Sequence, residues 1–469
     1  MPEMPESELL VLGGGPGGYA AAFHAADRGL KVTLVDAAKK PGGTCLHVGC
    51  IPSKALLHAA KLITDTRDAG ELGVYFEKPR IDVNAVRAHW MNVVGKLANN
   101  LLSMCKMRNV EFVQARVTFV DSHTVQFDNG SRRRFKHCII ATGSSPARPA
   151  ALFIESPRVM DSTAALRLED VPASLLVVGG GYIGLELGYV YAALGSRVTV
   201  VELTPTLLPG ADPDLVRPLK KRLEKLFDKI YLNTTVARPA EVENRVRVSL
   251  EGAGVTEREQ VFDRVLVSVG RVPNSRDLGL EKTGVKSNPK GFIQVDSQRR
   301  TGDEAIFAIG DVAGEPMLAH KATYEGRIAV EALVGEPAAY DVRAVPAVVF
   351  TDPEVAWCGL MENEAQRDGR EVKTTLFPWV ASGRAATLGR TEGLTKLVID
   401  PATDTILGVG IVGVDAGELI GEAVLAVEMG ASARDLELSM HPHPTLTETL
   451  MEAGELAHGN ATHLLAKKR

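Results

Sequence analysis

Two stretches of the chain share one order of apolar and polar positions. Residues 8–36, ELLVLGGGPGGYAAAFHAADRGLKVTLVD, and residues 174–202, SLLVVGGGYIGLELGYVYAALGSRVTVVE, each begin with an apolar, β-branched run. Such a run is typical of a buried strand. A glycine cluster follows, then the apolar spacing of a helix, then a second apolar run that ends in an acidic residue. The pattern predicts two β-α-β units, and their constant offset of 166 residues predicts an internal repeat.

Each unit carries the motif G-x-G-x-x-G between its first strand and its helix, and an acid follows the last glycine by 18 residues. This context indicates dinucleotide binding, because the glycines permit a tight turn, a close approach of the pyrophosphate, and packing of helix on strand. The carboxylate of the acid can accept hydrogen bonds from the hydroxyls of a ribose. The motif residues are Gly13, Gly15, Gly18 and Asp36 in the first unit, and Gly179, Gly181, Gly184 and Glu202 in the second.

The remaining pattern predicts an α/β protein with two Rossmann-like domains, residues 1–150 and 151–275, and a third domain. Residues 306–322, IFAIGDVAGEPMLAHKA, predict a strand, a loop that carries Asp311, and the start of a helix near Met317. From about residue 345 the pattern changes to strands such as LTKLVID and helices such as AGELIGEAVLAVEMG. Residues 345–469 are therefore expected to form an α+β domain.

Composition narrows the class of protein. The chain has 53 basic and 58 acidic residues and a net charge of −5, which argues against a nucleic-acid surface. No apolar run reaches the ~18 residues of a membrane span. The first residues lack the basic and apolar segments of a signal peptide, so a cytoplasmic location is expected.

Five cysteines in 469 residues are too few for a disulfide framework. Cys105, Cys138 and Cys358 lie in apolar runs and are expected to be buried as small hydrophobic residues. Cys45 and Cys50 instead lie together in GGTCLHVGCIPSK, residues 42–54. The pair could be a metal site, a structural bridge or a redox pair.

A zinc site needs about four ligands, and this single pair has the wrong spacing, so no metal is expected. In a regular helix, Cα atoms five residues apart are ~8.7 Å from one another. Bridged cysteines need less than about 7 Å, so a bridge here requires irregular backbone. Gly42, Gly43 and Gly49 can supply it. We expect Cys45 at a distorted helix start and Cys50 in the first turns.

The whole chain resembles the flavoprotein disulfide reductases, class I of the pyridine nucleotide-disulfide oxidoreductases. The resemblance is carried by GGTCLHVGCIPSK, both G-x-G-x-x-G units, ATGSSP (141–146), GRVPN (270–274), AIGDVAG (308–314) and HPHPTLTE (441–448). It implies an FAD-binding domain at 1–150, an NAD-binding domain at 151–275, a return segment of the FAD domain at 276–344, and a dimerisation domain at 345–469. A homodimer is therefore expected.

The same resemblance implies roles for individual residues. Cys45 and Cys50 would form the redox-active disulfide, with Cys45 as the interchange thiol and Cys50 as the thiolate beside the flavin. His443 would be the base, and Glu448 would orient its imidazole. The other residues expected to contact FAD or NAD are Gly13, Gly15, Gly18, Asp36, Gly43, Thr44, Lys54, Thr142, Gly143, Gly179, Gly181, Tyr182, Gly184, Glu186, Glu202, Gly270, Arg271, Gly310, Asp311, Met317, Leu318 and Ala319.

Some of these expectations are more specific. Lys54 and Glu186 would pair near flavin N5, and Tyr182 would gate the nicotinamide pocket. The helix that begins near Met317 would direct the N–H groups of Leu318 and Ala319 at flavin N1 and O2.

Within the family, Glu202 favours NAD over NADP, because a carboxylate repels a 2′-phosphate. The form HPTLTE resembles the members that oxidise dihydrolipoamide. The last cysteine is Cys358, so the chain lacks the extra redox groups that other members carry near the C-terminus. The implied partner is the lipoyl domain of a 2-oxo-acid dehydrogenase or glycine-cleavage complex. A reductase of the glutathione type and a catalytically silent flavoprotein scaffold are the alternatives.

The chain departs from the family pattern at two places. Asp36 stands where the family usually has a glutamate, and it is expected to reach the FAD ribose directly or through water. Pro442 separates His441 from His443, which leaves the role of His441 open.

Overall fold

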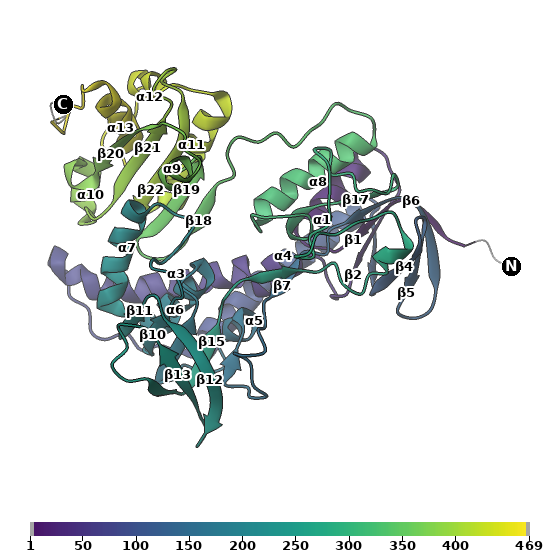
Figure 1. Cartoon of the computed structure of the whole chain (residues 1–469), viewed down its shortest axis with the longest axis horizontal. Coiled ribbons are helices and arrows are strands. Elements are labelled where there is room, and N and C mark those ends of the chain that lie inside the picture. The colour runs from purple at the N-terminus through teal and green to yellow at the C-terminus, as the bar shows by residue number, and fades with distance from the viewer. Residues whose placement is uncertain (1–3, 466–469) are drawn as a thin grey trace. The chain divides into compact units, whose positions relative to one another are not determined.

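The computed structural model describes residues 4–465, which form two compact units (Figure 1). The first unit comprises the described residues up to Ala55, together with Asn84–Ala147 and Val269–Asp341. The second comprises Leu56–Val83, Arg148–Ser268 and the described residues from Val342 onward. The division falls within helix α3 (Cys50–Asp68), after Ala55, and after Val83, the first residue of helix α4 (Val83–Met107).

A mixed sheet forms the centre of the first unit. Its strands are ordered β3-β2-β1-β6-β5-β4, and β17 also pairs with β6. β1 is parallel to both β2 and β6, as a β-α-β unit requires. The strands are β1 (Glu6–Leu12), β2 (Val32–Asp36), β3 (Glu111–Gln114), β4 (Val117–Asp121), β5 (Thr124–Phe127), β6 (Arg132–Ile140) and β17 (Ile306–Ala308). A separate antiparallel pair joins β7 (Ser144–Pro146) to β16 (Arg271–Pro273).

Two helices far apart in the sequence pack closely in the first unit. They are α1 (Pro16–Asp27) and α8 (Ala319–Leu333). A Cβ atom on Gly326 would lie 2.8 Å from the carbonyl oxygen of Gly17, so only glycine fits between the helices. Residues 319–333 therefore belong to the same unit as the N-terminal β-α-β unit. The remaining helices are α2 (Gly43–Val48), η2 (Leu280–Lys282) and η3 (Gly310–Val312).

The second β-α-β unit lies in the second unit of the molecule. A parallel sheet of order β11-β10-β9-β15-β8 carries helix α6 (Tyr182–Leu194) between β9 and β10. A second, antiparallel sheet, β12-β13-β14, lies between β11 and β15 in the sequence. The elements are β8 (Val159–Met160), α5 (Ser162–Leu166), β9 (Ser174–Val178), β10 (Arg197–Val201), α7 (Pro213–Leu226), β11 (Lys229–Tyr231), β12 (Thr235–Val242), β13 (Arg245–Glu251), β14 (Glu259–Phe262), β15 (Arg264–Val267) and η1 (Ala69–Leu72).

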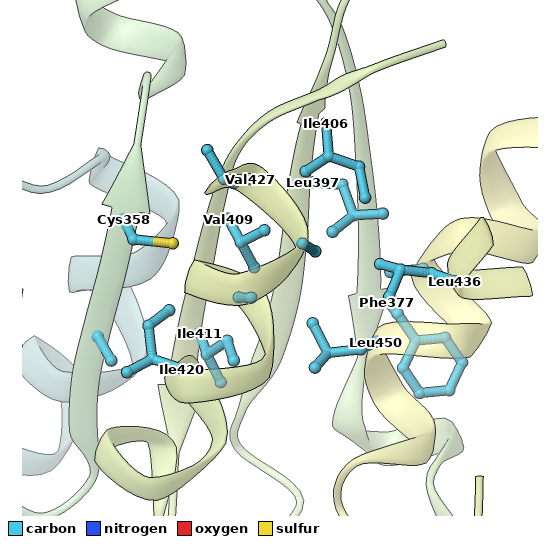
Figure 2. Close-up of a cluster of buried hydrophobic side chains, with 14 of the residues drawn as sticks. Cys358, Phe377, Leu397, Ile406, Val409, Ile411, Ile420, Val427, Leu436 and Leu450 are labelled. Atoms are coloured by element: carbon cyan, nitrogen blue, oxygen red, sulfur yellow. The ribbon is translucent and has the colours of Figure 1, made fainter. Parts of the chain in front are cut away.

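The C-terminal part of the second unit is an antiparallel sheet, β18-β19-β22-β21-β20, with helices packed on it. Figure 2 shows side chains of the strands, such as Val409 and Ile411, together with Ile420 and Leu450 of the helices in one buried cluster. The elements are β18 (Ala347–Val349), β19 (Glu354–Gly359), α9 (Glu362–Arg367), β20 (Lys373–Pro378), η4 (Trp379–Ala381), α10 (Gly383–Leu388), β21 (Leu394–Ile399), β22 (Ile406–Gly413), α11 (Ala416–Met429), α12 (Ala433–Leu438) and α13 (Glu448–His458).

The structure confirms the predicted α/β class and both β-α-β units. It also confirms that the C-terminal part combines strands and helices in an α+β arrangement. Cys105, Cys138 and Cys358 are buried as predicted, and Figure 2 shows Cys358 at the edge of the C-terminal cluster. The helix expected near Met317 begins two residues later, at Ala319. Among the described residues, no helix is long and apolar enough to cross a membrane.

Candidate active site

Gly49 separates two helices that each carry one cysteine of the pair. Cys45 lies in α2, and Cys50 is the first residue of α3. Gly49 has φ −143° and ψ −116°, so the helical path breaks there. A Cβ atom on Gly49 would lie 2.8 Å from the carbonyl oxygen of Thr44. The irregular backbone that a bridge requires is therefore present, but as a break between two helices rather than as one distorted helix.

The side chains of Cys45 and Cys50 share a hydrogen bond. That bond and burial raise the pKa of the Cys45 thiol well above its usual value. None of the cysteines in residues 4–465 forms a disulfide in this structure, which therefore shows the pair with two thiols. Two thiols in hydrogen-bonding contact can exchange between dithiol and disulfide, and Cys45 needs a base to become a nucleophile.

Tyr19 also lies close to the two thiols, although the sequence analysis did not single it out. Burial raises the pKa of Tyr19, and the charges of Cys45 and Cys50 raise it further. Tyr19 directly follows Gly18, the last glycine of the first motif, and lies in the first turn of helix α1. Its position next to Gly18 in the first motif was the only sequence signal for it.

The first glycine loop has the shape that a dinucleotide phosphate needs. Gly13 has φ +106°, and a Cβ atom on it would lie 2.2 Å from the carbonyl oxygen of Ala141. A Cβ atom on Gly18 would lie 1.7 Å from the carbonyl oxygen of Gly13, so helix and strand can approach only with glycine there. At Gly15 the nearest atom to such a Cβ is 3.8 Å away, which leaves the backbone open on that side. These features fit a pyrophosphate at the N-terminus of α1.

The second loop repeats the same geometry. Gly179 has φ +109°, and a Cβ atom on Gly184 would lie 2.2 Å from the carbonyl oxygen of Gly179. A Cβ atom on Gly181 would meet nothing within 4 Å. The loop therefore fits a second dinucleotide.

The two acids that end the second strands hold their own glycine loops. Asp36 accepts hydrogen bonds from the N–H of Gly14 at 2.5 Å and of Ala38 at 2.7 Å. Glu202 accepts the equivalent bonds from the N–H of Gly180 at 2.6 Å and of Thr204 at 2.8 Å. Aspartate thus makes in the first unit the contacts that glutamate makes in the second. Each carboxylate oxygen retains a lone pair for a ribose hydroxyl.

Motifs from three parts of the sequence meet beside Asp311. The Ser144 hydroxyl donates to Oδ2 of Asp311 at 2.5 Å, and Nε of Arg271 donates to that hydroxyl at 2.7 Å. Thr142 is held by Asn274, whose side-chain amide donates to the Thr142 carbonyl oxygen at 2.9 Å. The structure therefore brings ATGSSP, GRVPN and AIGDVAG together.

Gly143 and Gly270 adopt positive φ in the same neighbourhood. Ser144 and Asn274 were not singled out from the sequence, although both lie inside motifs that were quoted. Their importance depends on the pairing of β7 with β16, which joins residues 127 positions apart.

Helix α6 carries the residues that follow the second glycine loop. Tyr182 begins the helix and is 39% exposed. Glu186 is 3% exposed, and its Oε1 accepts the N–H of Phe350 at 3.0 Å. Glu186 is therefore a buried carboxylate with a backbone partner, and not a solvated surface charge.

His443 and Glu448 form a hydrogen-bonded pair at the start of α13. Nδ1 of His443 lies 2.8 Å from Oε1 of Glu448, and the N–H of Thr445 donates to Oε2 at 2.7 Å. Burial disfavours ionisation of Glu448, but the bonds from Thr445 and His443 outweigh it and hold the pKa of this carboxyl below its usual value. The His443 side chain is 70% exposed. A carboxylate on Nδ1 leaves Nε2 of the imidazole as the basic nitrogen.

His441 lies on the same loop, but it is turned inward. Its side chain is 6% exposed, with Nε2 at 2.8 Å from Oε1 of Glu422 and Nδ1 at 2.8 Å from the carbonyl oxygen of Ser439. Both ring nitrogens are engaged, so His441 anchors the loop and His443 is the histidine that can act as a base.

The sites divide between the two units. Cys45, Cys50, Lys54 and Asp311 belong to the first unit, and Glu186, His443 and Glu448 belong to the second. Within residues 4–465, no cluster of three or more His, Cys, Asp or Glu side chains is arranged to hold a metal ion.

Two family models match nearly the whole chain. The model described as pyridine nucleotide-disulphide oxidoreductase matches residues 7–326, and the model of the dimerisation domain of these enzymes matches residues 345–454. Together they span both glycine loops, the thiol pair and the His443–Glu448 pair.

Curated relatives and solved structures match over the same length. The dihydrolipoyl dehydrogenase of Haemophilus influenzae is 45% identical over 98% of this chain and 96% of its own. That of Thermus scotoductus is 47% identical over 98% of this chain and 100% of its own. Among solved structures, LpdA of Mycobacterium tuberculosis is similar with a TM-score of 0.88 and 27% identity, covering 96% of this chain and 99% of that chain. The flavoprotein disulfide reductase RclA of Escherichia coli, a protein induced by HOCl, is similar with a TM-score of 0.84 and 28% identity, covering 94% of this chain and 98% of that chain.

Proposed function

The chain belongs to the pyridine nucleotide-disulphide oxidoreductase family, and on that premise we propose how it carries out the dihydrolipoyl dehydrogenase reaction. It oxidises dihydrolipoamide to lipoamide, reduces NAD⁺ to NADH, and uses FAD between the two. The observation that carries this proposal is the hydrogen-bonded pair of Cys45 and Cys50 in a chain with two dinucleotide-binding loops.

FAD supplies, when bound, a two-electron acceptor between the thiol pair and NAD⁺. The first glycine loop, with Gly43, Thr44, Thr142, Gly143, Gly310 and Asp311, would hold it. The second loop, with Tyr182 and Glu202, would hold NAD. In this arrangement Gly270 and Arg271 support the FAD site through Ser144, and Lys54 and Glu186 would flank the flavin.

The chain's own chemistry begins with a proton transfer. Nε2 of His443 accepts a proton from the dithiol substrate, which makes a thiolate nucleophile. Glu448 holds Nδ1 protonated and stabilises the imidazolium that forms. The thiolate attacks Cys45 of the Cys45–Cys50 disulfide, forms a mixed disulfide and releases Cys50 as a thiolate. The second substrate thiol then attacks the substrate sulfur of that mixed disulfide and closes the lipoamide ring. His443 gives its proton to the departing Cys45 sulfur and takes the proton of this second thiol, so the pair is left with a Cys45 thiol and a Cys50 thiolate.

The same base serves the reduced pair of thiols. A thiol that retains its proton in the reduced pair can leave as a thiol if a protonated His443 lies beside it. In the reverse reaction, the reduction of lipoamide, Cys45 must lose its proton to become a nucleophile, and this requires the same base.

The chain forms a homodimer, since residues 345–454 match the dimerisation domain of the family. We place the base of each active site on the second copy: Cys45 and Cys50 of one chain would meet His443 and Glu448 of the other. The exposure of His443 supports this, because a base must be accessible to a substrate and to the thiol pair of a neighbouring chain.

The division of the chain follows from these roles. Residues 1–150 and 276–344 would form the FAD-binding domain, 151–275 the NAD-binding domain, and 345–469 the dimerisation domain. The natural substrate would be the lipoyl domain of a 2-oxo-acid dehydrogenase or glycine-cleavage complex, in the cytoplasm. Co-purification of the tagged chain with one of these complexes tests the partner.

A substrate panel tests the reaction. Purified holoenzyme should oxidise dihydrolipoamide with NAD⁺ at a kcat/KM far above that for reduction of glutathione disulfide with NADPH. Preference for glutathione disulfide would identify a reductase of that type, and absence of turnover with every disulfide would identify a silent scaffold.

A further inference from the structure

A buried group of charges lies behind the turn that carries Asp311. Glu325 of α8 is 0% exposed, and its Oε1 accepts hydrogen bonds from Nη1 of Arg299 at 3.0 Å and from Nζ of Lys321 at 2.9 Å. Its Oε2 accepts the N–H of Gly310 at 2.6 Å. Every contact lies within the first unit, and none of these side chains has a part in the proposed proton or thiol chemistry.

Gly310 has a backbone conformation that glycine adopts readily and other residues do not. It has φ +72°, and a Cβ atom on it would lie 2.9 Å from Cβ of Ala322 in α8. Asp311 follows directly, and its carboxylate is held by Ser144. The Gly310–Asp311 turn is therefore fixed from two sides, by Glu325 at the N–H of Gly310 and by Ser144 at the carboxylate of Asp311.

The arrangement around Glu325 is costly as a purely structural device. Two cations share one buried carboxylate, which leaves a net charge of +1 in the group. Lys321 lies in the first turn of α8, where the helix dipole disfavours a cation. Arg299 has φ +65°, a conformation that is strained for a residue with a side chain. Buried ion pairs are in general weak sources of stability, so a role beyond stability is the better explanation.

We infer that Glu325 is a positioning residue for FAD: it fixes the Gly310–Asp311 turn in the shape that receives the hydroxyls of the cofactor before the cofactor binds. The inference rests on the proposed contact between Asp311 and FAD. A turn fixed in advance loses little conformational entropy on binding, so the cofactor is held more tightly than by a turn that must first be ordered. Arg299 and Lys321 act through Glu325 by holding its carboxylate in place.

Two variants separate the position of the turn from the balance of buried charge. In E325Q the group changes from two cations and one anion to two cations alone. In E325Q/K321M one cation is also removed, so the net charge returns to +1 while the carboxylate at Gly310 remains absent. The double variant therefore keeps the test valid if the single variant folds poorly.

Asp303 provides a matched control in the same unit. It is 9% exposed and accepts the N–H groups of Gly284 at 3.0 Å and Ala305 at 3.1 Å, so it is also a buried carboxylate that holds backbone. It precedes β17, whereas Gly310 follows that strand. D303N makes the same change from carboxylate to amide at the opposite end of the strand.

The measurement is the dissociation constant of FAD from apoprotein, followed by quenching of flavin fluorescence, with the melting temperature of each apoprotein alongside. Loss of one charged hydrogen bond predicts FAD binding weakened about tenfold or more in E325Q and in E325Q/K321M. D303N should lower the melting temperature and leave FAD affinity within about twofold of wild type.

Two results would overturn the inference. One is wild-type FAD affinity in E325Q/K321M. The other is a loss of FAD affinity in D303N as large as in the double variant at the same melting temperature. D311N separates the inference from its premise: if D311N also binds FAD as wild type does, the placement of FAD at Asp311 is wrong. If D311N weakens FAD while E325Q/K321M does not, only the role of Glu325 is wrong.

Discussion

Oε1 of Glu448 lies 2.8 Å from Nδ1 of His443, and the glutamate side chain is 17% exposed whereas the histidine is 70% exposed. The partly buried carboxylate of Glu448 thus holds Nδ1 of the imidazole, and the histidine side chain remains exposed to solvent. A second histidine two residues earlier has both ring nitrogens engaged with Glu422 and Ser439. The difference between these two histidines leads to the first prediction.

H443Q should lower kcat/KM for dihydrolipoamide about 10²–10⁴-fold, because the reaction loses its general base. E448Q should lower it less, since the imidazole remains but loses the charge that orients it. Steady-state assays with NAD⁺ measure both. H441Q is the control from the same loop and should retain more than about a tenth of wild-type kcat/KM. A greater loss in H441Q than in H443Q would contradict the assignment of the base.

C45S should abolish oxidation of dihydrolipoamide, with turnover reduced by several orders of magnitude, because no disulfide can form with Cys50. The protein should remain yellow with one FAD per chain, and the Cys50 thiolate should give a long-wavelength absorbance band. Turnover and the visible spectrum are the measurements. C105S alters a buried thiol of the first unit, which is 1% exposed, and should retain activity. Near-wild-type turnover of C45S would show that Cys45 is not the interchange thiol.

Glu202 should make NAD⁺ strongly preferred over NADP⁺, because a 2′-phosphate would meet a carboxylate that is only 8% exposed. E202Q keeps the size of the side chain and removes its charge, so the ratio of kcat/KM for the two cofactors should fall. D36N, the equivalent change in the first unit, should leave this ratio unchanged because that acid belongs to the other loop. Equal kcat/KM for both cofactors in the wild type would refute the argument.

Glu354 predicts a dependence of stability on pH. Burial raises its pKa from 4.5 to about 7, aided by the charges of Asp415, Glu418 and Asp352 and opposed by the N–H of Gly417. The folded state therefore holds a proton that the unfolded state releases between about pH 4.5 and 7, so this group lowers stability as pH rises through that window.

E354Q removes this titration and should gain stability over wild type as pH rises from 4.5 to 7, by on the order of 3 kcal/mol. Melting temperatures across this window measure the difference, which should be constant above pH 7. E418Q makes the same charge change on an exposed neighbour and should keep most of the wild-type slope. A parallel pH dependence for E354Q and wild type would contradict the burial argument.

The sequence predicted the elements whose signals are local. Both glycine loops, their flanking strands and the acids Asp36 and Glu202 follow from residues within 30 positions of one another, and the structure shows the same contacts in both copies. The buried cysteines followed from apolar context in the same way. The nearby cysteine pair was predicted to need irregular backbone, and the break at Gly49 supplies it.

The sequence did not predict contacts made across long separations. Ser144 joins Asp311 and Arg271 only because β7 pairs with β16. Glu325 reaches Gly310 because α8 returns alongside η3, and Tyr19 approaches the thiols because α1 and α2 meet near Gly15 and Gly43. Such contacts depend on tertiary packing, for which periodicity and spacing carry no signal.

The shared active site is tested by mixing two inactive chains. C45S lacks the interchange thiol and H443Q lacks the base, so each homodimer should be inactive. We predict that the purified heterodimer, selected with two different affinity tags, recovers about half of the wild-type dihydrolipoamide turnover. One of its two sites would then combine Cys45 and Cys50 of one chain with His443 of the other, and the second site would carry both defects. A C45S/C45S dimer isolated with the same two tags is the control and should stay inactive. A heterodimer as inactive as its parents would contradict a site built from two chains.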